Sequence, residues 1–165
     1  MRYFLIFIVT LFIFPLVSSS YDKSHIKKLD TLNKCEKCDL SEARLWGKNL
    51  KGANLNKAII VNSTLARSDL TKANLKRADL YRTNLFKTIL TEADLSEANL
   101  TDADLTEANL EGARSTRANL TRANLTRANL TDADFEDAIM RDAIINGAIF
   151  CRTKMPWGEE NGGCE

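Results

Sequence analysis

An apolar residue recurs, with one exception, at every fifth position from Leu40 to Phe150 without a change of phase, which gives 23 consecutive repeats. Leucine fills 17 of these central positions, and alanine fills 17 of the positions two residues earlier. The residue just before the centre is Asn or Asp in 15 repeats. We call these positions the centre, the alanine slot and the asparagine slot. The two residues after each centre are the first and second turn residues.

A period of five fits neither an α-helix nor a flat strand. On a helix each residue turns by about 100°, so residues five apart would drift around the cylinder. On a flat strand an odd spacing would send successive leucines to opposite faces. Both conflicts disappear if alanine and leucine point inward from one short extended side and the chain then turns a corner. The sequence therefore predicts a solenoid with an alanine ladder and a leucine ladder inside.

The repeated unit reads Ala, then Asn or Asp, then Leu, then two polar residues, most cleanly in residues 93–102. This pattern resembles the motif of the pentapeptide-repeat family, and the resemblance covers residues 36–150. It implies an all-β fold, a right-handed quadrilateral parallel β-helix with four repeats to a coil. The 23 repeats would then make between five and six coils. At the usual strand spacing the rod would be roughly 28 Å long.

The ends of the chain suggest three further segments. Residues 1–20 read as a secretory signal peptide, with Arg2, an apolar stretch from Tyr3 to Phe14 and small residues before the expected cleavage site. The apolar stretch is shorter than the ~20 residues that span a bilayer. We therefore expect an exported protein, periplasmic or secreted, with no stable membrane span after signal cleavage. An uncleaved anchor is the alternative.

Residues 21–34 are expected to form an N-terminal capping helix, because Ile26, Leu29 and Leu32 are spaced by three. The predicted solenoid covers residues 35–150. Residues 151–165 would form a C-terminal cap closed by a disulfide. Each cap would cover one open end of the coil.

The four cysteines fall into two groups at opposite ends of the predicted rod: Cys35 with Cys38, and Cys151 with Cys164. Exported chains usually oxidise their cysteines, and a disulfide needs Cα atoms within about 7 Å. Within one monomer only the pairs Cys35 to Cys38 and Cys151 to Cys164 meet this requirement. The Cys-x-x-Cys spacing also permits a thiol redox role or half of a metal site. Without a second such motif or a histidine nearby in the sequence, we predict no metal and no cofactor.

Both ends of the coil add to the resemblance. The start, Cys-x-x-Cys-Asp-Leu, and the end, Phe-Cys-x-Thr-x-Met-Pro, are similar to those of exported bacterial pentapeptide-repeat proteins, a group of mostly unknown function. Where members often carry Asp-Gly after Met-Pro, this chain has Trp157-Gly158. The glycine is kept, so we expect the turn to be kept.

Several positions depart from the repeat. Ser115 replaces a central leucine, and the larger Phe135, one coil later at the same corner, could fill the gap. Lys48 occupies an alanine slot, which predicts a distorted first coil with a bulge that lets the ammonium reach water. Thr83 and Thr88 in alanine slots need only a hydrogen-bond partner for the hydroxyl.

The second turn residues carry runs of like charge that would pair with opposite charge 20 residues away. The basic run and the acidic run that follows it are Arg67, Lys72, Arg77, Arg82, Lys87, then Glu92, Glu97, Asp102 and Glu107. With four sides to a coil, ladders such as Arg77, Glu97, Arg117 and Asp137 would climb one side. Exposed pairs of this kind contribute only about 0 to 1 kcal/mol each.

Two apolar surfaces are candidates for partner binding. Trp46, Ala66 and Phe86 are first turn residues spaced by 20, so they would stack as a ridge, with Val61 and Tyr81 on the adjoining side. The partner-binding residues that we predict are Trp46, Phe86, Val61 and Tyr81. At the other end Ile139, Ile144 and Ile149 fill asparagine slots, and either the tail covers them or they form a homodimer contact through the rod end.

The sequence lacks an arrangement of acid, base and nucleophile, so we predict no catalytic residues and no enzyme. Some family members mimic DNA and inhibit topoisomerases through a strongly acidic rod. This chain has 23 basic and 22 acidic residues in alternating bands, which argues against that alternative and against nucleic acid as a partner. The favoured prediction is an exported structural or interaction rod whose partner is an unknown protein or a cell-envelope component. DNA mimicry and thiol redox chemistry are the alternatives.

Overall fold

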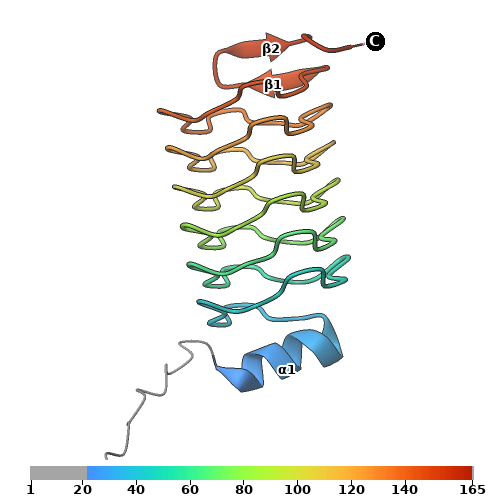
Figure 1. The fold of residues 1–165 in the computed structure, drawn as a ribbon, viewed down its shortest axis with the longest axis vertical. Helices are drawn as coiled ribbons and strands as arrows, with labels where there is room; N and C mark the ends of the chain where they lie inside the picture. Colours follow the sequence, from blue (N-terminus) through green and yellow to red (C-terminus); the bar gives the residue numbers. More distant parts are fainter. Residues whose placement is uncertain (1–21, 165) are drawn as a thin grey trace, which may run out of the picture.

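The computed structural model describes residues 22–164, which form a rod with a helix at one end and a hairpin at the other (Figure 1). The chain begins in α1 (Lys23–Leu32), winds through stacked coils, and ends in β1 (Thr153–Met155) and β2 (Gly158–Glu160). The predicted signal peptide lies outside the described residues. Among the residues described, no helix has the length and apolar character needed to cross a membrane.

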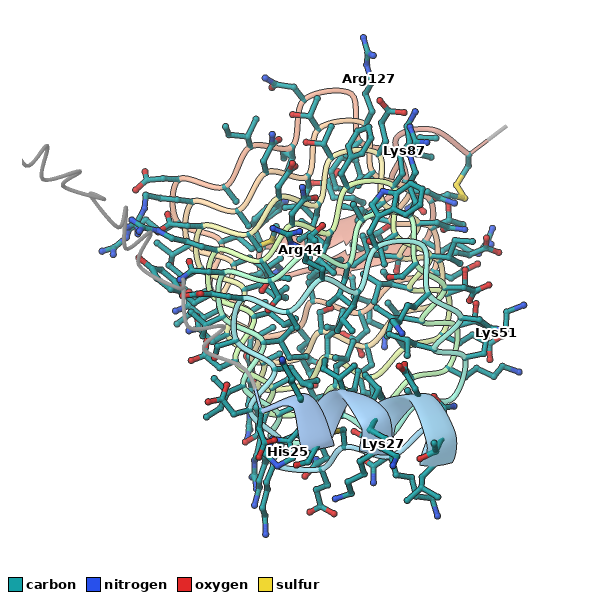
Figure 2. All side chains as sticks on the ribbon, turned by 60° about the horizontal axis from the view of Figure 1, so that its bottom comes forward. His25, Lys27, Arg44, Lys51, Lys87 and Arg127 are labelled. Carbon is teal, nitrogen blue, oxygen red and sulfur yellow. A yellow bond between two sulfur atoms is a disulfide. The ribbon has the colours of Figure 1, made fainter. Side chains whose placement is uncertain are left out.

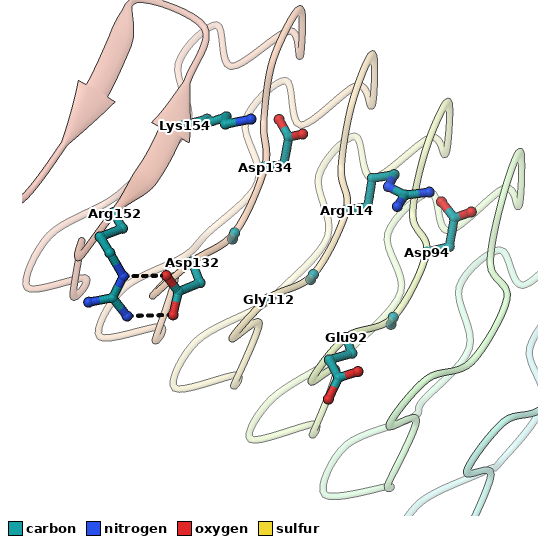
Figure 3. Close-up of a pocket in the computed structure, with 11 residues that line it drawn as sticks. Glu92, Asp94, Gly112, Arg114, Asp132, Asp134, Arg152 and Lys154 are labelled. Carbon is teal, nitrogen blue, oxygen red and sulfur yellow. Dashed lines mark hydrogen bonds and ion pairs between the residues drawn. The ribbon is translucent and has the colours of Figure 1, made fainter.

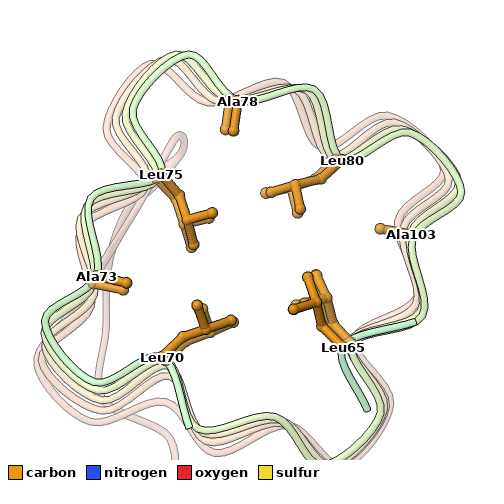
Figure 4. Close-up of a cluster of buried hydrophobic side chains, with 14 of the residues drawn as sticks. Leu65, Leu70, Ala73, Leu75, Ala78, Leu80 and Ala103 are labelled. Carbon is orange, nitrogen blue, oxygen red and sulfur yellow. The ribbon is translucent and has the colours of Figure 1, made fainter. Parts of the chain in front are cut away.

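Each coil takes 20 residues and has four five-residue sides (Figure 4). Parallel bridges join residues 20 apart without interruption, from Lys34 with Asn54 to Asp134 with Lys154. The hydrogen bonds follow one rule: the N–H of Leu105 donates to the carbonyl of Asn124 at 2.7 Å, and the N–H of Asn124 donates to Ala103 at 2.9 Å. The predicted four repeats per coil are present. Pairing through the coils uses single bridges, and the only regular strands in residues 22–164 are β1 and β2.

The core consists of the leucine and alanine ladders. Figure 4 looks down the rod and shows Leu65, Leu70, Leu75 and Leu80 pointing inward from four corners of one coil. These leucines are fully buried, as is nearly every alanine two residues before a centre. The pattern arises because residues two apart on an extended side point the same way. The side chain between them points outward, which explains why that position tolerates polar residues.

Where the asparagine slot holds Asn or Asp, its side chain stabilises the turn that follows. In residues 104–106 the Asp104 carboxylate accepts the backbone N–H of Thr106 at 3.0 Å, and the second turn residue, Glu107, has a positive φ of 56°. Asn and Asp favour such turns because their short side chains reach the N–H group two residues later. The same bond recurs along the rod, for example from Thr126 to Asn124 at 3.0 Å. The sequence preference for Asn or Asp therefore has a local cause in the turn.

Helix α1 lies across the first coil. Its N-cap is Asp22, whose carboxylate accepts the N–H of Ser24 at 2.7 Å, and it ends at Asn33, which has a left-handed φ of 51°. Leu29 is buried at 1% exposure and joins the core. The helix thus closes the N-terminal end of the leucine ladder.

The predicted bulge at Lys48 is wrong. The bridge between Asn49 and Asp69 is intact, and the carbonyl of Lys48 accepts the N–H of Asp69 at 2.9 Å. The ammonium of Lys48 instead donates to the Asp30 carboxylate of α1 at 2.6 Å. Lys48 belongs to the first coil, where the helix lies below it instead of another coil. Its side chain therefore leaves the core without any change in the backbone.

The other polar residues in the core behave as their sizes suggest. The hydroxyls of Thr83 and Thr88 donate to the carbonyls of Ile60 and Leu65, at 2.6 and 2.9 Å. Ser115 is fully buried, and its hydroxyl has no hydrogen-bond partner within the described part of the chain. Phe135 is also fully buried. A small and a large side chain thus follow each other at one corner of successive coils.

The β1–β2 hairpin covers only part of the C-terminal end of the rod. β1 and β2 pair antiparallel, with Thr153 and Met155 of β1 buried, and Lys154 continues the coil pairing by accepting the N–H of Phe135 at 2.7 Å. The core residues of the last coil are only half-buried, in contrast to those of earlier coils; they are Met140, Ala143, Ile145, Ala148 and Phe150. This end of the rod is therefore apolar and partly open.

Candidate interaction surfaces

The disulfide between Cys35 and Cys38 lies beneath α1. Both cysteines are buried, at 0% and 1% exposure, with Cα atoms 5.2 Å apart. His25 of the helix covers this region, and its Nδ1 lies 3.2 Å from the backbone N–H of Asp39. Thiol exchange requires a thiolate to reach a disulfide sulfur directly. Burial of both residues removes that access, so the geometry favours a structural bridge over the redox alternative.

The second disulfide joins Cys151 to Cys164, with Cα atoms 4.9 Å apart, and ties the tail to the last coil. Both bridges match the pairs that the sequence predicts. Within residues 22–164 there is no cysteine outside a disulfide. The same residues contain no group of three or more His, Cys, Asp or Glu side chains suited to hold a metal ion.

The predicted ridge has the expected register but is discontinuous. The N–H of Gly47 donates to the carbonyl of Ala66, and the N–H of Arg67 to that of Phe86, so Trp46, Ala66 and Phe86 occupy equivalent positions in successive coils. Trp46 is 61% exposed, whereas Ala66 is only 5% exposed. A single methyl group between two large side chains, each one strand spacing of about 4.8 Å away, does not reach the surface.

Two aromatic residues of the predicted binding surface, Tyr81 and Phe86, each have a cation above the ring. The Arg82 guanidinium lies 5.0 Å from the ring centre of Tyr81, and the Lys87 ammonium lies 5.1 Å from that of Phe86. Tyr81, Phe86 and Val61 are all half-buried. The surface that we predicted for partner binding thus consists of one exposed tryptophan, the half-buried Val61, and two half-buried rings with basic groups above them.

Four ion pairs surround the middle of the rod. The second turn residues of one coil each contact their counterpart 20 residues later: Lys72 with Glu92, Arg77 with Glu97, Arg82 with Asp102, and Lys87 with Glu107. The distances run from 2.7 to 3.8 Å. We call this set the ion-pair girdle. The ladder that we predicted from Arg77 forms only in part. Arg77 pairs with Glu97, and Arg117 pairs with Asp137 at 3.7 Å, but Glu97 and Arg117 do not form an ion pair.

Ion pairing keeps several carboxylates ionised. Hydrogen bonds from Arg77, Arg122 and Arg152 lower the pKa values of Glu97, Asp102 and Asp132 below their ordinary range. A general acid near neutral pH needs its pKa raised instead. These groups therefore act as fixed negative charges.

A shallow hollow of about 430 Å³ lies on one side of the C-terminal half (Figure 3). It forms at Gly112, which occupies a second-turn position between Glu92 and Asp132 and contributes no side chain. Its Asp132 is held by Arg152 in a two-point ion pair, with both bonds at 2.6 Å. Figure 3 shows acidic and basic groups alternating along the wall, with Arg114 between Asp94 and Asp134. The hollow is therefore open and lined by charges of both signs.

The charges separate along the rod, which our sequence analysis missed by treating them as alternating bands. Residues 22–90 hold 15 Lys and Arg against 7 Asp and Glu, a net charge of +8. Residues 91–165 hold 7 against 15, a net charge of −8. A running sum of charge along the sequence would have shown this. The ion-pair girdle lies where the two halves meet.

The open C-terminal end is the second apolar surface. Ile139 is 54% exposed, and Ile144 and Ile149 are each 45% exposed. The tail reaches only the last of them, because Gly163 lies against the Ile149 side chain, and it leaves all three largely exposed. The backbone N–H groups of Met140 and Ile145 also have no partner inside residues 22–164, unlike that of Leu120, which donates to Ile139. The last coil therefore presents isoleucines and unpaired backbone together.

Comparison with known proteins identifies the family. The pentapeptide repeats family, with 8 copies, matches residues 34–77, 49–86, 78–114 and 118–155. No curated protein matches the chain. Among solved structures, a pentapeptide repeat protein from the Arabidopsis thaliana thylakoid lumen is 31% identical, with a TM-score of 0.59, over 64% of this chain and 70% of that one.

Two cyanobacterial structures are also similar. A pentapeptide repeat protein of Cyanothece 51142 is 26% identical, with a TM-score of 0.46, over 76% of this chain and 92% of that one. HetL of Nostoc, a protein involved in heterocyst differentiation regulation, is 28% identical with a TM-score of 0.37, over 76% of this chain and 75% of that one. Because the family match covers most of the chain and agrees with the 20-residue coil, the chain belongs to the pentapeptide repeat family.

Proposed function

We propose that this protein is an exported, non-enzymatic rod, a right-handed solenoid, that works by binding another macromolecule. The observation that carries this proposal is the placement of its exposed apolar side chains. Most large exposed hydrophobic residues lie toward the two ends, with Trp46 at 61% and Ile139 at 54% exposure, and Ile89 in the middle is less exposed, at 39%. Between them most outward positions are polar or charged. Exposed apolar groups that gather in one region of an otherwise polar surface are typical of contact sites, and Ile139, Ile144 and Ile149 gather in this way.

The first contact is the aromatic surface of Trp46, Phe86, Val61 and Tyr81, which we assign to an unknown protein or cell-envelope component. Aromatic side chains beside cations are common in binding surfaces, because they bury a large area and keep a polar rim. Changing Trp46 and Phe86 together to Ser should abolish cross-linking to a partner in the export compartment. The matched control changes Thr106 and Thr126 to Ser, at the same turn position on the same side.

The second contact is a homodimer through the open C-terminal end. The open end exposes unpaired backbone N–H groups and half-buried core residues. The same end of a second copy can pair with these backbone groups and cover the apolar residues. Since α1 covers the opposite end, copies cannot stack head to tail, and two C-terminal ends meeting about a two-fold axis make a closed pair. Ile139→Ser with Ile144→Ser should convert a dimer into a monomer in sedimentation velocity. A wild-type protein that sediments as a monomer at all concentrations would exclude this contact.

Neither alternative function gains support. Burial of the Cys35 to Cys38 bridge opposes thiol redox chemistry. DNA mimicry needs an acidic rod, whereas the N-terminal half here carries a net charge of +8.

A further inference from the structure

We propose that the lysine-rich N-terminal cap, residues 22–37, is a docking surface for an anionic lipid bilayer. This inference shares one assumption with the proposed function, namely that the protein is exported. It uses neither the aromatic surface nor the open C-terminal end, and its test is a vesicle measurement that does not depend on them.

The positive charge that is free to bind a partner gathers at this end. All four basic side chains of the ion-pair girdle already face a carboxylate. By contrast, eight cations of the cap and first coils make no ion pair with any described residue: Lys23, Lys27, Lys28, Lys34, Lys37, Arg44, Lys57 and Arg67. Four carboxylates of residues 22–67 lie outside ion pairs: Asp22, Glu36, Asp39 and Glu42. Two of them, Asp22 and Asp39, accept backbone N–H groups.

Helix α1 presents its cations away from the rod. Leu29 is buried against the first coil, and Lys23, Lys27 and Lys28 are exposed. At 100° per residue all three lysines lie on the half of the helix turned away from Leu29. Figure 2 looks toward this end and shows α1 lying across it, with Lys27 outside the coils. Asp30, the acidic residue within α1, is neutralised by Lys48.

The surface also carries an apolar group. Leu32, at the end of α1, is 60% exposed. At 100° per residue it lies about 40° from Lys28 and at the edge of the face that packs on the rod. Because Ile26 and Leu29 of α1 pack against the rod, Leu32 is the one large apolar side chain that this helix leaves exposed, and the attraction to an anionic bilayer is mainly that of the lysines. The sequence before the cap is apolar from Tyr3 to Phe14, so synthesis and export bring this end of the rod to a bilayer first. These facts favour lipid over nucleic acid.

The test uses the chain from Tyr21 to Glu165, because both caps and the whole core lie within residues 22–164. Circular dichroism verifies the fold of each variant. Binding is measured by co-sedimentation with vesicles of phosphatidylcholine alone and with vesicles that also contain phosphatidylglycerol. We expect binding only to the anionic vesicles, and loss of that binding at high salt because the charges are screened.

The decisive variant changes Lys23, Lys27 and Lys28 to Gln, which preserves helix propensity. Each lysine near an anionic surface contributes about fivefold, so binding should fall about one hundredfold. The matched control changes Arg114, Arg127 and Arg141 to Gln, which lie in the acidic half and also lack an ion pair within the described chain. It should bind as the wild type does.

Three results would overturn the proposal. The first is equal binding of the wild type to neutral and anionic vesicles. The second is unchanged binding of the triple-lysine variant. The third is tighter binding of the wild type to duplex DNA than to anionic vesicles in the same buffer, which would identify the surface as one for nucleic acid.

Discussion

The Arg77 guanidinium lies 2.7 Å from the carboxylate of Glu97, a residue 20 positions later in the chain and one coil along the rod. The pKa of Glu97 is lowered mainly by its hydrogen bond from Arg77. Similar bonds lower the pKa values of Asp102 and Asp132. A carboxyl group with a lowered pKa in the folded state adds stability above its unfolded pKa and loses it as the pH falls.

The first prediction therefore concerns acid. The melting temperature should fall as the pH drops below the ordinary carboxyl range of 3.8 to 4.5, because protonation breaks these pairs. A variant with Glu97→Gln, Asp102→Asn and Asp132→Asn should show a smaller fall over the same range. Parallel curves for the wild type and the variant would mean that the pairs do not form in solution.

The second prediction separates inward from outward positions. Leu105→Ala should lower the free energy of unfolding by about 2 to 5 kcal/mol, because it opens a cavity in a regular ladder. Thr106→Ala, at the next residue and outside the core, should cost less than about 0.5 kcal/mol. Urea denaturation of both variants measures the difference. Equal costs would contradict the burial pattern.

The third prediction concerns Ser115 and Phe135. Ser115→Ala should raise the free energy of unfolding by about 1 kcal/mol, because a buried hydroxyl without a partner is removed. Ser115→Leu alone should overpack the corner, and Phe135→Leu alone should leave a void. The double variant should be more stable than the sum of the two single changes predicts. Additive effects would show that the two side chains do not share space.

The fourth prediction concerns the tail. Replacing Cys151 and Cys164 by Ser should lower the free energy of unfolding by about 3 kcal/mol, the chain-entropy estimate for a loop of this length. Peptide mapping without reduction should find Cys35 joined to Cys38 and Cys151 joined to Cys164. A peptide that links Cys35 to Cys151 within a monomer would be incompatible with a rod.

The repeat could be predicted from the sequence because every five-residue unit has the same pattern of inward apolar residues and turn residues. Leu105 must point inward for the same reason as Leu80, and the turn at Asp104 closes for the same reason as the turn at Asn124. Residues beyond the repeat lack this redundancy. The partner of Lys48 depends on how α1 lies across the first coil, and no periodic pattern specifies that angle.

The candidate surfaces were predicted less well than the fold. The register of Trp46 and Phe86 is correct, because it follows from the 20-residue coil. Exposure does not follow from register, and Ala66 lies below the surface between its neighbours. The exposure of Ile139 depends on where the tail lies after Cys151, and the five-residue repeat does not determine the position of the tail.

The 20-residue coil has a consequence for changes in length. Removing 20 residues from the middle would shorten the rod by one coil and leave each remaining side facing its original direction. Removing five would preserve inward leucines and turn everything beyond by a quarter of a revolution. Lys72 would then face a residue other than Glu92. Most basic residues of the girdle would lie opposite the acidic residue that now pairs with a neighbour. Natural variation in this chain should therefore insert or delete whole coils more often than single repeats.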